Sequence, residues 1–202
     1  MRVAALYDVH GMPWALEAVL AEVRVDADAI VFGGDLTGGP CEEETLALAR
    51  SVDATWVRGN TEDDSFPLAV ELDGVTYCHA TPADNTPITT AITPDEDLVA
   101  AFGESGTFVI GHTHHQFDRR VGALRVINAG SIGMPYEGEV AAFWTLVADG
   151  EPEFRRTPID VERAVREIRA SDWPKAEEFI AENLLVAVPR EVAIETFEAQ
   201  RS

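Results

Sequence analysis

Residues 3–14 read VAALYDVHGMPW, an apolar run that stops at two polar side chains and then meets a proline. The run Val3 to Tyr7 predicts a short buried strand, and Pro13 predicts the first turn of a helix. Four apolar residues then recur at helical spacing: Leu16, Val19, Leu20 and Val23. The chain therefore begins with a strand and a helix, and Asp8 and His10 follow the end of the strand.

The same arrangement is repeated twice further along the chain. The apolar run 29–32 ends at Gly33-Gly34-Asp35 and is followed by a helical pattern over 42–50. A third strand, 54–57, ends at Gly59-Asn60. Three apolar strands joined by two helices predict a βαβαβ unit, that is, a parallel sheet with right-handed crossovers.

The second half of the chain is read mainly as hairpins. Residues 68–72 and 75–78 flank Asp73-Gly74, and residues 140–147 and 154–157 flank Asp149-Gly150. Two further strands are expected at 107–110 and 123–128. The stretch Thr93-Pro94-Asp95-Glu96 predicts a capping box that starts a helix toward Phe102. These signals together predict a largely antiparallel second half.

After Pro158 the pattern becomes helical, and Asp160 is expected to cap the first of these helices. Further helical segments are expected after Trp173-Pro174 and over 191–200. We therefore divide the chain into a domain of residues 1–158 and a helical extension, residues 159–202, packed on that domain.

The composition limits the classes of partner. The chain has 202 residues, of which 15 are basic and 36 acidic, for a formal net charge of −21. Such a surface repels nucleic-acid phosphates and anionic membranes, so extended nucleic-acid binding is disfavoured. No apolar run is long enough to cross a bilayer, and two cysteines are too few for a disulfide framework. We expect a cytoplasmic protein with reduced thiols.

Polar side chains collect at the ends of the predicted strands. The set comprises Asp8, His10, Asp35, Asn60, His79, His112 and His114. Taken singly, each is commonly a turn former, a helix cap or a core histidine. Ligands bind at the carboxyl ends of strands in α/β sheets, and the recurrence at almost every strand predicts one shared site. Imidazole and carboxylate together suit transition metals, and Asp35 is the candidate to bridge two ions.

In chain order these residues form five motifs: Asp8-x-His10, Gly34-Asp35, Gly59-Asn60, His79 and Gly111-His112-Thr113-His114. Their order resembles the calcineurin-like metallophosphoesterases. HGMPWALEAVL at 10–20 and NAGSIGMP at 128–135 resemble the small bacterial phosphodiesterase branch. The resemblance covers residues 1–158. It implies a four-layer α/β/β/α sandwich of two mixed sheets flanked by helices, with a C-terminal helical tail.

The resemblance also implies two divalent transition-metal ions, with Mn favoured and Fe, Ni, Zn or Co as alternatives. The ligands of one ion would be Asp8, His10, Asp35 and His114. The ligands of the other would be Asp35, Asn60, His79 and His112, with Asp35 shared. Of these, the candidate catalytic residues are Asp35, Asn60 and His112. The metals would also supply the positive charge that an acidic protein needs to bind an anionic substrate.

The expected activity is hydrolysis of a small phosphoester, specifically a phosphodiester, by attack of a hydroxide that bridges the two metals. Many members of the wider family carry Gly-Asn-His after the third strand, where this chain has Gly59-Asn60-Thr61-Glu62. Glu62, Asp63 or His115 could replace that histidine as leaving-group acid or as support for the ligands. Otherwise His115 is expected to face solvent. A preference for activated aryl phosphodiesters follows.

Two alternatives share the same ligand set. One is a phosphomonoesterase. The other is a non-catalytic metal-binding scaffold that binds partner proteins, as the retromer subunit with this fold does. A scaffold could lose a histidine without penalty, so the complete set of seven ligand positions favours the enzyme. The sequence leaves the oligomeric state open, and a homodimer is compatible with it.

Overall fold

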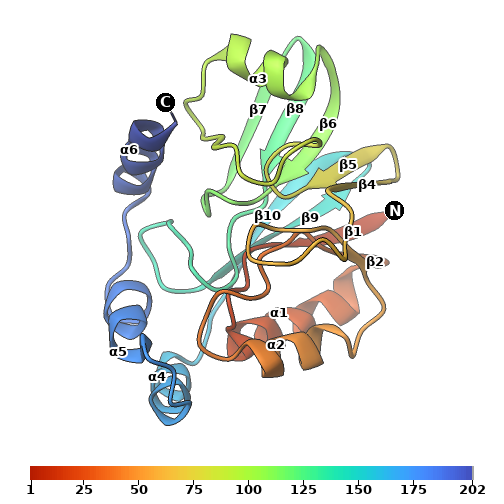
Figure 1. The fold of residues 1–202 in the computed structure, drawn as a ribbon. Coiled ribbons are helices and arrows are strands. Elements are labelled where there is room, and N and C mark those ends of the chain that lie inside the picture. The colour runs from red at the N-terminus through yellow and green to blue at the C-terminus, as the bar shows by residue number, and fades with distance from the viewer. Residues whose placement is uncertain (202) are drawn as a thin grey trace.

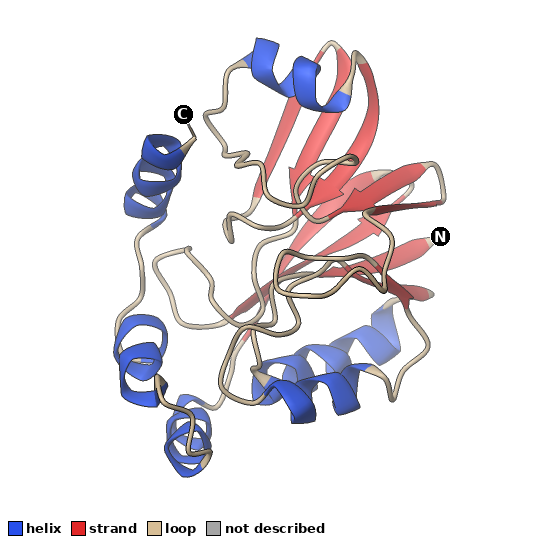
Figure 2. Ribbon diagram, in the orientation of Figure 1, coloured by secondary structure: helices blue, strands red, loops and turns tan. Residues whose placement is uncertain are grey.

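Two five-stranded sheets pack face to face, and helices cover their outer faces (Figures 1 and 2). The computed structural model describes residues 1–201, so Ser202, the last residue of the predicted extension, lies outside the described residues. The strand order is β10-β9-β1-β2-β3 in the first sheet and β4-β5-β6-β8-β7 in the second. The predicted α/β/β/α fold with two mixed sheets is confirmed.

The first sheet contains the predicted βαβαβ unit. Strands β1 (Arg2–Leu6), β2 (Ala29–Phe32) and β3 (Thr55–Trp56) are parallel neighbours. Strands β9 (Ala142–Ala148) and β10 (Glu151–Thr157) extend this sheet in antiparallel pairing, with β9 beside β1. Helices α1 (Pro13–Asp26) and α2 (Glu42–Ala49) cover its outer face. The loops after β1, β2 and β3 therefore leave the sheet at one edge.

The second sheet is more parallel than the hairpin signals indicated. Strands β4 (Ala69–Leu72) and β5 (Val75–Cys78) form the expected hairpin. However, β5, β6 (Ser105–Ile110) and β8 (Ala123–Asn128) are parallel neighbours. The connection from β5 to β6 crosses over through helix α3 (Asp95–Phe102), which turns the chain back to the same starting edge. The prediction of a largely antiparallel second half was wrong for these three strands.

One strand and one cap also differ from expectation. Strand β7 (Phe117–Val121) was not predicted, because Phe117 is its only fully buried residue and three polar residues follow. The predicted capping box is wrong: α3 begins at Asp95 without a side-chain cap. The Thr93 hydroxyl instead accepts a hydrogen bond from the Thr90 amide (2.9 Å) and donates to Glu198 (3.3 Å).

Three apolar cores separate the four layers. The core between the sheets is built from small and β-branched residues with two large aromatic side chains, Tyr7 and Tyr77. A second core lies between the first sheet and its helices, and a third lies between the second sheet and α3, where Leu98 and Phe102 are buried. Each buried leucine-sized side chain contributes about 1.5–3 kcal/mol, so all three cores hold the strand ends in register.

The C-terminal segment consists of α4 (Val161–Ala170), α5 (Ala176–Phe179), a π-helical turn η1 (Ile180–Leu184) and α6 (Arg190–Gln200). The Asp160 carboxylate accepts a hydrogen bond from the Arg163 amide, which confirms the predicted cap. Ala164 and Ile168 of α4 and Ile180 and Leu184 of η1 belong to the same buried core as α1. The division at residue 158 stays a prediction.

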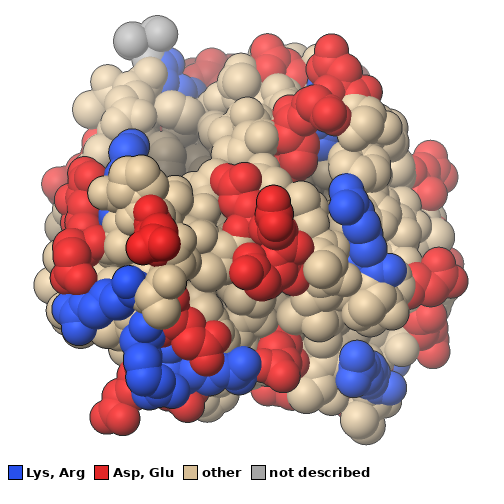
Figure 3. Space-filling view, turned by 60° about the horizontal axis from the view of Figure 1, so that its bottom comes forward, with Lys and Arg blue, Asp and Glu red and all other residues tan. Residues whose placement is uncertain are grey.

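The outer surface carries the acidic excess. Asp and Glu side chains are spread over the face shown in Figure 3, and Lys and Arg side chains occupy less of it. None of the helices formed by residues 1–201 is both long and apolar enough to cross a membrane. Any anionic ligand must therefore be attracted by local rather than overall charge.

Candidate metal centre

Five of the seven side chains predicted to bind metal form two overlapping groups. The groups are Asp8, His10 and His114, and Asp8, Asp35 and His79, with ligand atoms within 4.8 Å of one another in each group. All five side chains are buried. Asp8 belongs to both groups. Asp35 belongs to the second group, but its Oδ2 lies close to a histidine of each group, 3.8 Å from His10 Nε2 and 3.6 Å from His79 Nε2.

Each of the two carboxylates keeps one oxygen free. Asp8 Oδ2 accepts a hydrogen bond from the His112 amide (3.0 Å), and Asp35 Oδ1 accepts one from the Thr61 amide (2.9 Å). The remaining oxygens, Asp8 Oδ1 and Asp35 Oδ2, face the histidines. Backbone amides from neighbouring loops therefore fix the orientation of both carboxylates.

Three imidazole rings are oriented in the same way. The Nδ1 atoms of His10, His79 and His114 lie 3.1, 3.0 and 2.8 Å from the carbonyl oxygens of residues 37, 33 and 134. A carbonyl oxygen only accepts, so each Nδ1 carries the hydrogen and donates. Each Nε2 then presents a lone pair toward the carboxylates. This arrangement is the one in which a second-nitrogen hydrogen bond orients a metal-binding histidine.

The remaining two predicted ligands lie at the edge of the cluster. Asn60 Oδ1 lies 3.0 Å from His79 Nε2, and the His112 ring is 5.1 Å from the His79 ring. His112 Nε2 donates to the Thr86 carbonyl (3.0 Å), which leaves Nδ1 as its free nitrogen. His112 therefore has the opposite orientation from the other three rings.

The buried donor set fits a cation. Asp8 Oδ1 is buried without any hydrogen-bond partner among the described residues, 3.4 Å from His114 Nε2. His10 Nε2 and His114 Nε2 lie 3.2 Å apart. A proton on His114 can satisfy only one of these acceptors at a time, whereas a metal ion contacts several at once. Buried acceptors without partners are costly, so the residues present suit the metals that this fold implies.

Charge and burial act against each other inside the cluster. Burial opposes ionisation of Asp8, but His114, His79 and His10 together lower the pKa of its carboxyl below the usual range. Burial, followed by the charge of His114, lowers the pKa of His10 to about 4. Burial also lowers the pKa of His112. Burial opposes protonation of His114, but the charge of Asp8 raises the pKa of this imidazole. The cluster therefore favours an ionised Asp8 beside neutral His10 and His112, with a proton on His114 that a bound metal would replace.

Of the residues considered as leaving-group acids, Glu62 is bound to backbone amides, whereas Asp63 is exposed. The Glu62 carboxylate accepts hydrogen bonds from the amides of Asp35 (2.9 Å), Leu36 (2.6 Å) and Gly59 (2.8 Å). It therefore ties the loop after β2 to the loop after β3. Asp63 is exposed and accepts from the Ser65 amide (3.0 Å).

His115 is fully buried, so the expectation that it faces solvent was wrong. Its Nδ1 donates to the Thr113 carbonyl (2.8 Å), and its Nε2 accepts from the Ala91 amide (3.3 Å). Burial lowers the pKa of this imidazole to about 4, so the ring is neutral near pH 7. Both nitrogens are already engaged in holding the 89–93 segment against the loop after β6.

The backbone of the cluster is unusual. Asp8, His10, Asp35, His112 and His114 all have positive φ, between 47° and 65°. Residues other than glycine rarely adopt this left-handed conformation, which costs about 1–3 kcal/mol each. Two glycines allow the loops to approach: a Cβ on Gly59 would lie 2.1 Å from Asp35 Oδ1, and one on Gly111 would lie 2.5 Å from Asp8 Oδ2.

Sequence reasoning missed Tyr136. Its ring stacks on the His114 ring, with centroids 5.0 Å apart and planes 24° apart. The Tyr136 amide donates to the His114 carbonyl (3.1 Å). The available signal was its place directly after the NAGSIGMP motif, whose Met134 carbonyl orients His114.

Two sheets with helical outer layers and a buried cluster of Asp and His at the strand ends define a metallophosphoesterase, a metal-dependent hydrolase of phosphoric esters. The chain belongs to the calcineurin-like phosphoesterase superfamily, whose domain model matches residues 1–150. This match confirms the family resemblance read from the motifs.

Solved structures share the fold. A metallophosphoesterase from Sphaerobacter thermophilus superposes with a TM-score of 0.77 and 21% identity, covering 93% of this chain and 99% of that one. A hypothetical protein from Pyrococcus horikoshii OT3 gives 0.74 and 16%, covering 90% and 98%. Yfce, a phosphoesterase from E. coli, gives 0.54 and 21%, covering 79% and 100%. No curated protein shows significant sequence similarity.

Proposed function

We propose that this chain hydrolyses phosphodiesters at a pair of divalent metal ions held by the seven clustered residues. The observation that supports this most is that both ligand groups include Asp8 and that Asp35 Oδ2 lies within 4 Å of a histidine of each group. Carboxylates shared between neighbouring groups suit two adjacent cations rather than one. We assign Asp8, His10, Asp35 and His114 to one ion and Asp35, Asn60, His79 and His112 to the other.

The two ions held by these residues would supply positive charge for the phosphate and the means to activate a water as the nucleophile. The protein's own contribution is to fix the donors beforehand. Backbone amides orient Asp8 and Asp35, and carbonyl oxygens orient His10, His79 and His114. Preorganised donors avoid the cost of rearrangement during the reaction. Asp35, Asn60 and His112 are the proposed catalytic residues.

The placement of Glu62 and His115 supports a preference for good leaving groups. Both side chains are committed to backbone partners, and Asp63 is exposed beyond them. A diester whose leaving group needs no protonation would place the smallest demand on this site. We therefore propose aryl phosphodiesters as the best substrates in vitro.

The mixed imidazole and carboxylate donors support Mn as the bound metal, with Fe, Ni, Zn or Co as competitors. The free thiols of Cys41 and Cys78 are compatible with a cytoplasmic location. That location and a homodimer stay predictions. They do not enter the mechanism.

The test is a panel of phosphate monoesters and diesters assayed with Mn, Ni, Mg and a chelator. We expect hydrolysis of bis(4-nitrophenyl) phosphate with Mn, slower hydrolysis of 4-nitrophenyl phosphate, and loss of both with chelator. Faster monoester hydrolysis would support the phosphomonoesterase alternative. Metal binding without any hydrolysis would support the scaffold.

A further inference from the structure

An apolar cavity lies directly behind the Tyr136 ring. Its volume is about 800 Å³. It opens to solvent and is lined by Met134 and Tyr136, by residues of η1, by the segment that follows η1, and by α6. Figure 1 shows the loop between β8 and β9 facing the segment that joins η1 to α6, and the Gly138 amide donates to the Val188 carbonyl there (2.9 Å). Small-molecule sites in proteins commonly have volumes of about 300–1,000 Å³.

Tyr136 and Met134 contact both the cavity and the metal centre. One side of Tyr136 stacks on His114 at 5.0 Å, and Phe197 of α6 lies 6.1 Å from the same ring. Met134 also belongs to both, because its carbonyl orients His114 and its side chain lines the cavity. A ligand in the cavity is therefore one aromatic ring away from a predicted metal ligand.

The lining indicates which part of a substrate it would hold. Tyr136, Phe197 and Met134 offer aromatic and thioether surface, and Val186 and Val192 add aliphatic surface. None of the described residues that line the cavity is Lys or Arg, whereas Glu182 is among them. The phosphate itself is therefore disfavoured there, and an uncharged group is favoured.

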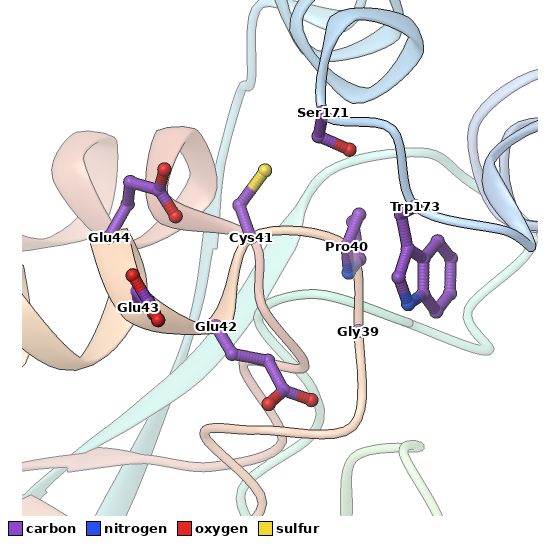
Figure 4. A pocket seen from close by; sticks show the side chains of 8 residues that line it. All are labelled: Gly39, Pro40, Cys41, Glu42, Glu43, Glu44, Ser171 and Trp173. Atoms are coloured by element: carbon purple, nitrogen blue, oxygen red, sulfur yellow. The ribbon is translucent and has the colours of Figure 1, made fainter.

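A second cavity provides a contrast. It measures about 390 Å³ and lies between the start of α2 and the loop after α4 (Figure 4). Three glutamates, Glu42, Glu43 and Glu44, line it together with Cys41, whose pKa is raised by burial. None of the seven predicted metal ligands lines either cavity, but Tyr136, which stacks on His114, lines only the first one. An acidic cavity without such a connection to the metal centre is poorly suited to any part of a phosphoester.

We propose that the cavity beside Tyr136 binds the uncharged organic group, aromatic by preference, that a phosphodiester keeps after hydrolysis. This inference rests on the proposed function and adds a substrate class to it. Helix α6 and η1 then act as the specificity element, because they supply most of the lining while the sheets supply the metal centre. Polar contacts at both ends hold α6 in place: Arg190 with Glu137, Glu198 with Thr90 and Thr93, and Arg201, directly after the helix, with Asp97.

The experiment compares two diesters with the same leaving group, methyl 4-nitrophenyl phosphate and benzyl 4-nitrophenyl phosphate, on the full chain with Mn. We expect kcat/KM to be about 10-fold or more higher for the benzyl ester, since burial of an aromatic group is worth that much. Phe197→Ala should reduce this ratio about 5-fold. Thr196→Trp, which fills the cavity rather than enlarging it, should bring the ratio close to one.

Leu185→Ala is the matched control. Leu185 is 64% exposed, next to the lining residue Val186 but outside the cavity, so the ratio should not change. A second measurement needs no metal: benzyl alcohol should give saturation-transfer NMR signals with chelator-treated protein, and Thr196→Trp should remove them.

The outcomes separate this inference from the proposed function. If neither diester is hydrolysed, the proposed function fails, and the NMR measurement still decides whether the cavity binds an aromatic group. Equal rates for the two esters, or a benzyl preference that survives Thr196→Trp, would overturn the inference. So would light scattering that shows a dimer which Val192→Asp converts to monomers, since the cavity would then be a subunit interface.

Discussion

The two sheets bring different chemistry to the same site. Loops of the first sheet supply both carboxylates and the amide, Asp8, Asp35 and Asn60, together with one imidazole. Loops of the second sheet supply imidazoles alone: His79, His112 and His114. Each of the two ligand groups takes members from both sheets. Each ligand group is therefore complete only when the two sheets are packed together.

Contacts across the sheets support this view. The His112 amide of the second sheet orients Asp8 of the first, and the Tyr7 hydroxyl donates to the Val109 carbonyl (2.9 Å) in the buried layer between them. The difference between the sheets also has an electrostatic consequence. The anionic side depends on the imidazole side, or on a metal, to remain buried.

The largest expected effect comes from Asp35, the carboxylate assigned to both metal ions. Asp35→Asn keeps an acceptor for the Thr61 amide but removes the charge. We expect kcat/KM to fall about 10³-fold or more, while His114→Asn on the second sheet costs about 100-fold because it is assigned to one ion. Kinetics with Mn and metal analysis of the purified variants measure both. Equal losses would mean that the two sheets contribute alike.

The second-largest effect is expected from metal removal, which should lower the stability of the folded protein. Without a cation, Asp8 Oδ1 has no partner and faces Asp35 across the histidines. Metal at 100 times its dissociation constant stabilises a protein by about 2.7 kcal/mol, which for a chain of this length raises Tm by roughly 5–10 °C. Calorimetry with Mn and with chelator measures this shift. In Asp35→Asn, which affects both ions, the shift should nearly vanish, and an undiminished shift would contradict the assigned centre.

The sequence predicted which residues meet but not how they are held. Asp8, Asp35, His79 and His114 could be grouped because the carboxyl ends of buried strands share an edge. The prediction for the second sheet gave more weight to the Asp73-Gly74 turn signal than to the helix expected before Phe102. That helix returns the chain to the same starting edge, so the strands that flank it, β5 and β6, are parallel.

Other features of the site leave little trace in the sequence. The positive φ of five ligand residues follows from tertiary contacts, since none of the five is a glycine. Tyr136 lies in a loop, where no periodicity marks it. Glu62 was noted only for its proximity to Asn60, and its four amide partners, Asp35, Leu36, Thr37 and Gly59, are evident only in the folded chain.

Substitution of Glu62 should reduce activity by a smaller amount, because Glu62 contacts only the loops of the first sheet. Glu62→Ala leaves the amides of Asp35, Leu36 and Gly59 without their acceptor, so the loops after β2 and β3 lose their connection. We expect a 10–100-fold loss of metal affinity and activity, as is typical for residues that orient ligands. Asp63→Ala, one position along and exposed, is the control and should have no measurable effect. A general acid would instead show a normal metal affinity and a loss that disappears with 4-nitrophenyl leaving groups.

The smallest effect is expected on the second sheet, at His115. Its two nitrogens are engaged with Thr113 and Ala91, away from the carboxylates, so it can neither bind metal nor reach a leaving group without unfolding that loop. His115→Gln, which can donate and accept at similar positions, should change kcat/KM less than about 3-fold while lowering stability by about 1–3 kcal/mol through imperfect replacement of buried hydrogen bonds. Steady-state kinetics and urea unfolding measure the two quantities. A large loss of kcat/KM at unchanged stability would contradict this prediction. It would mean that His115 takes part in the reaction and that the second sheet supplies a catalytic imidazole as well as metal ligands.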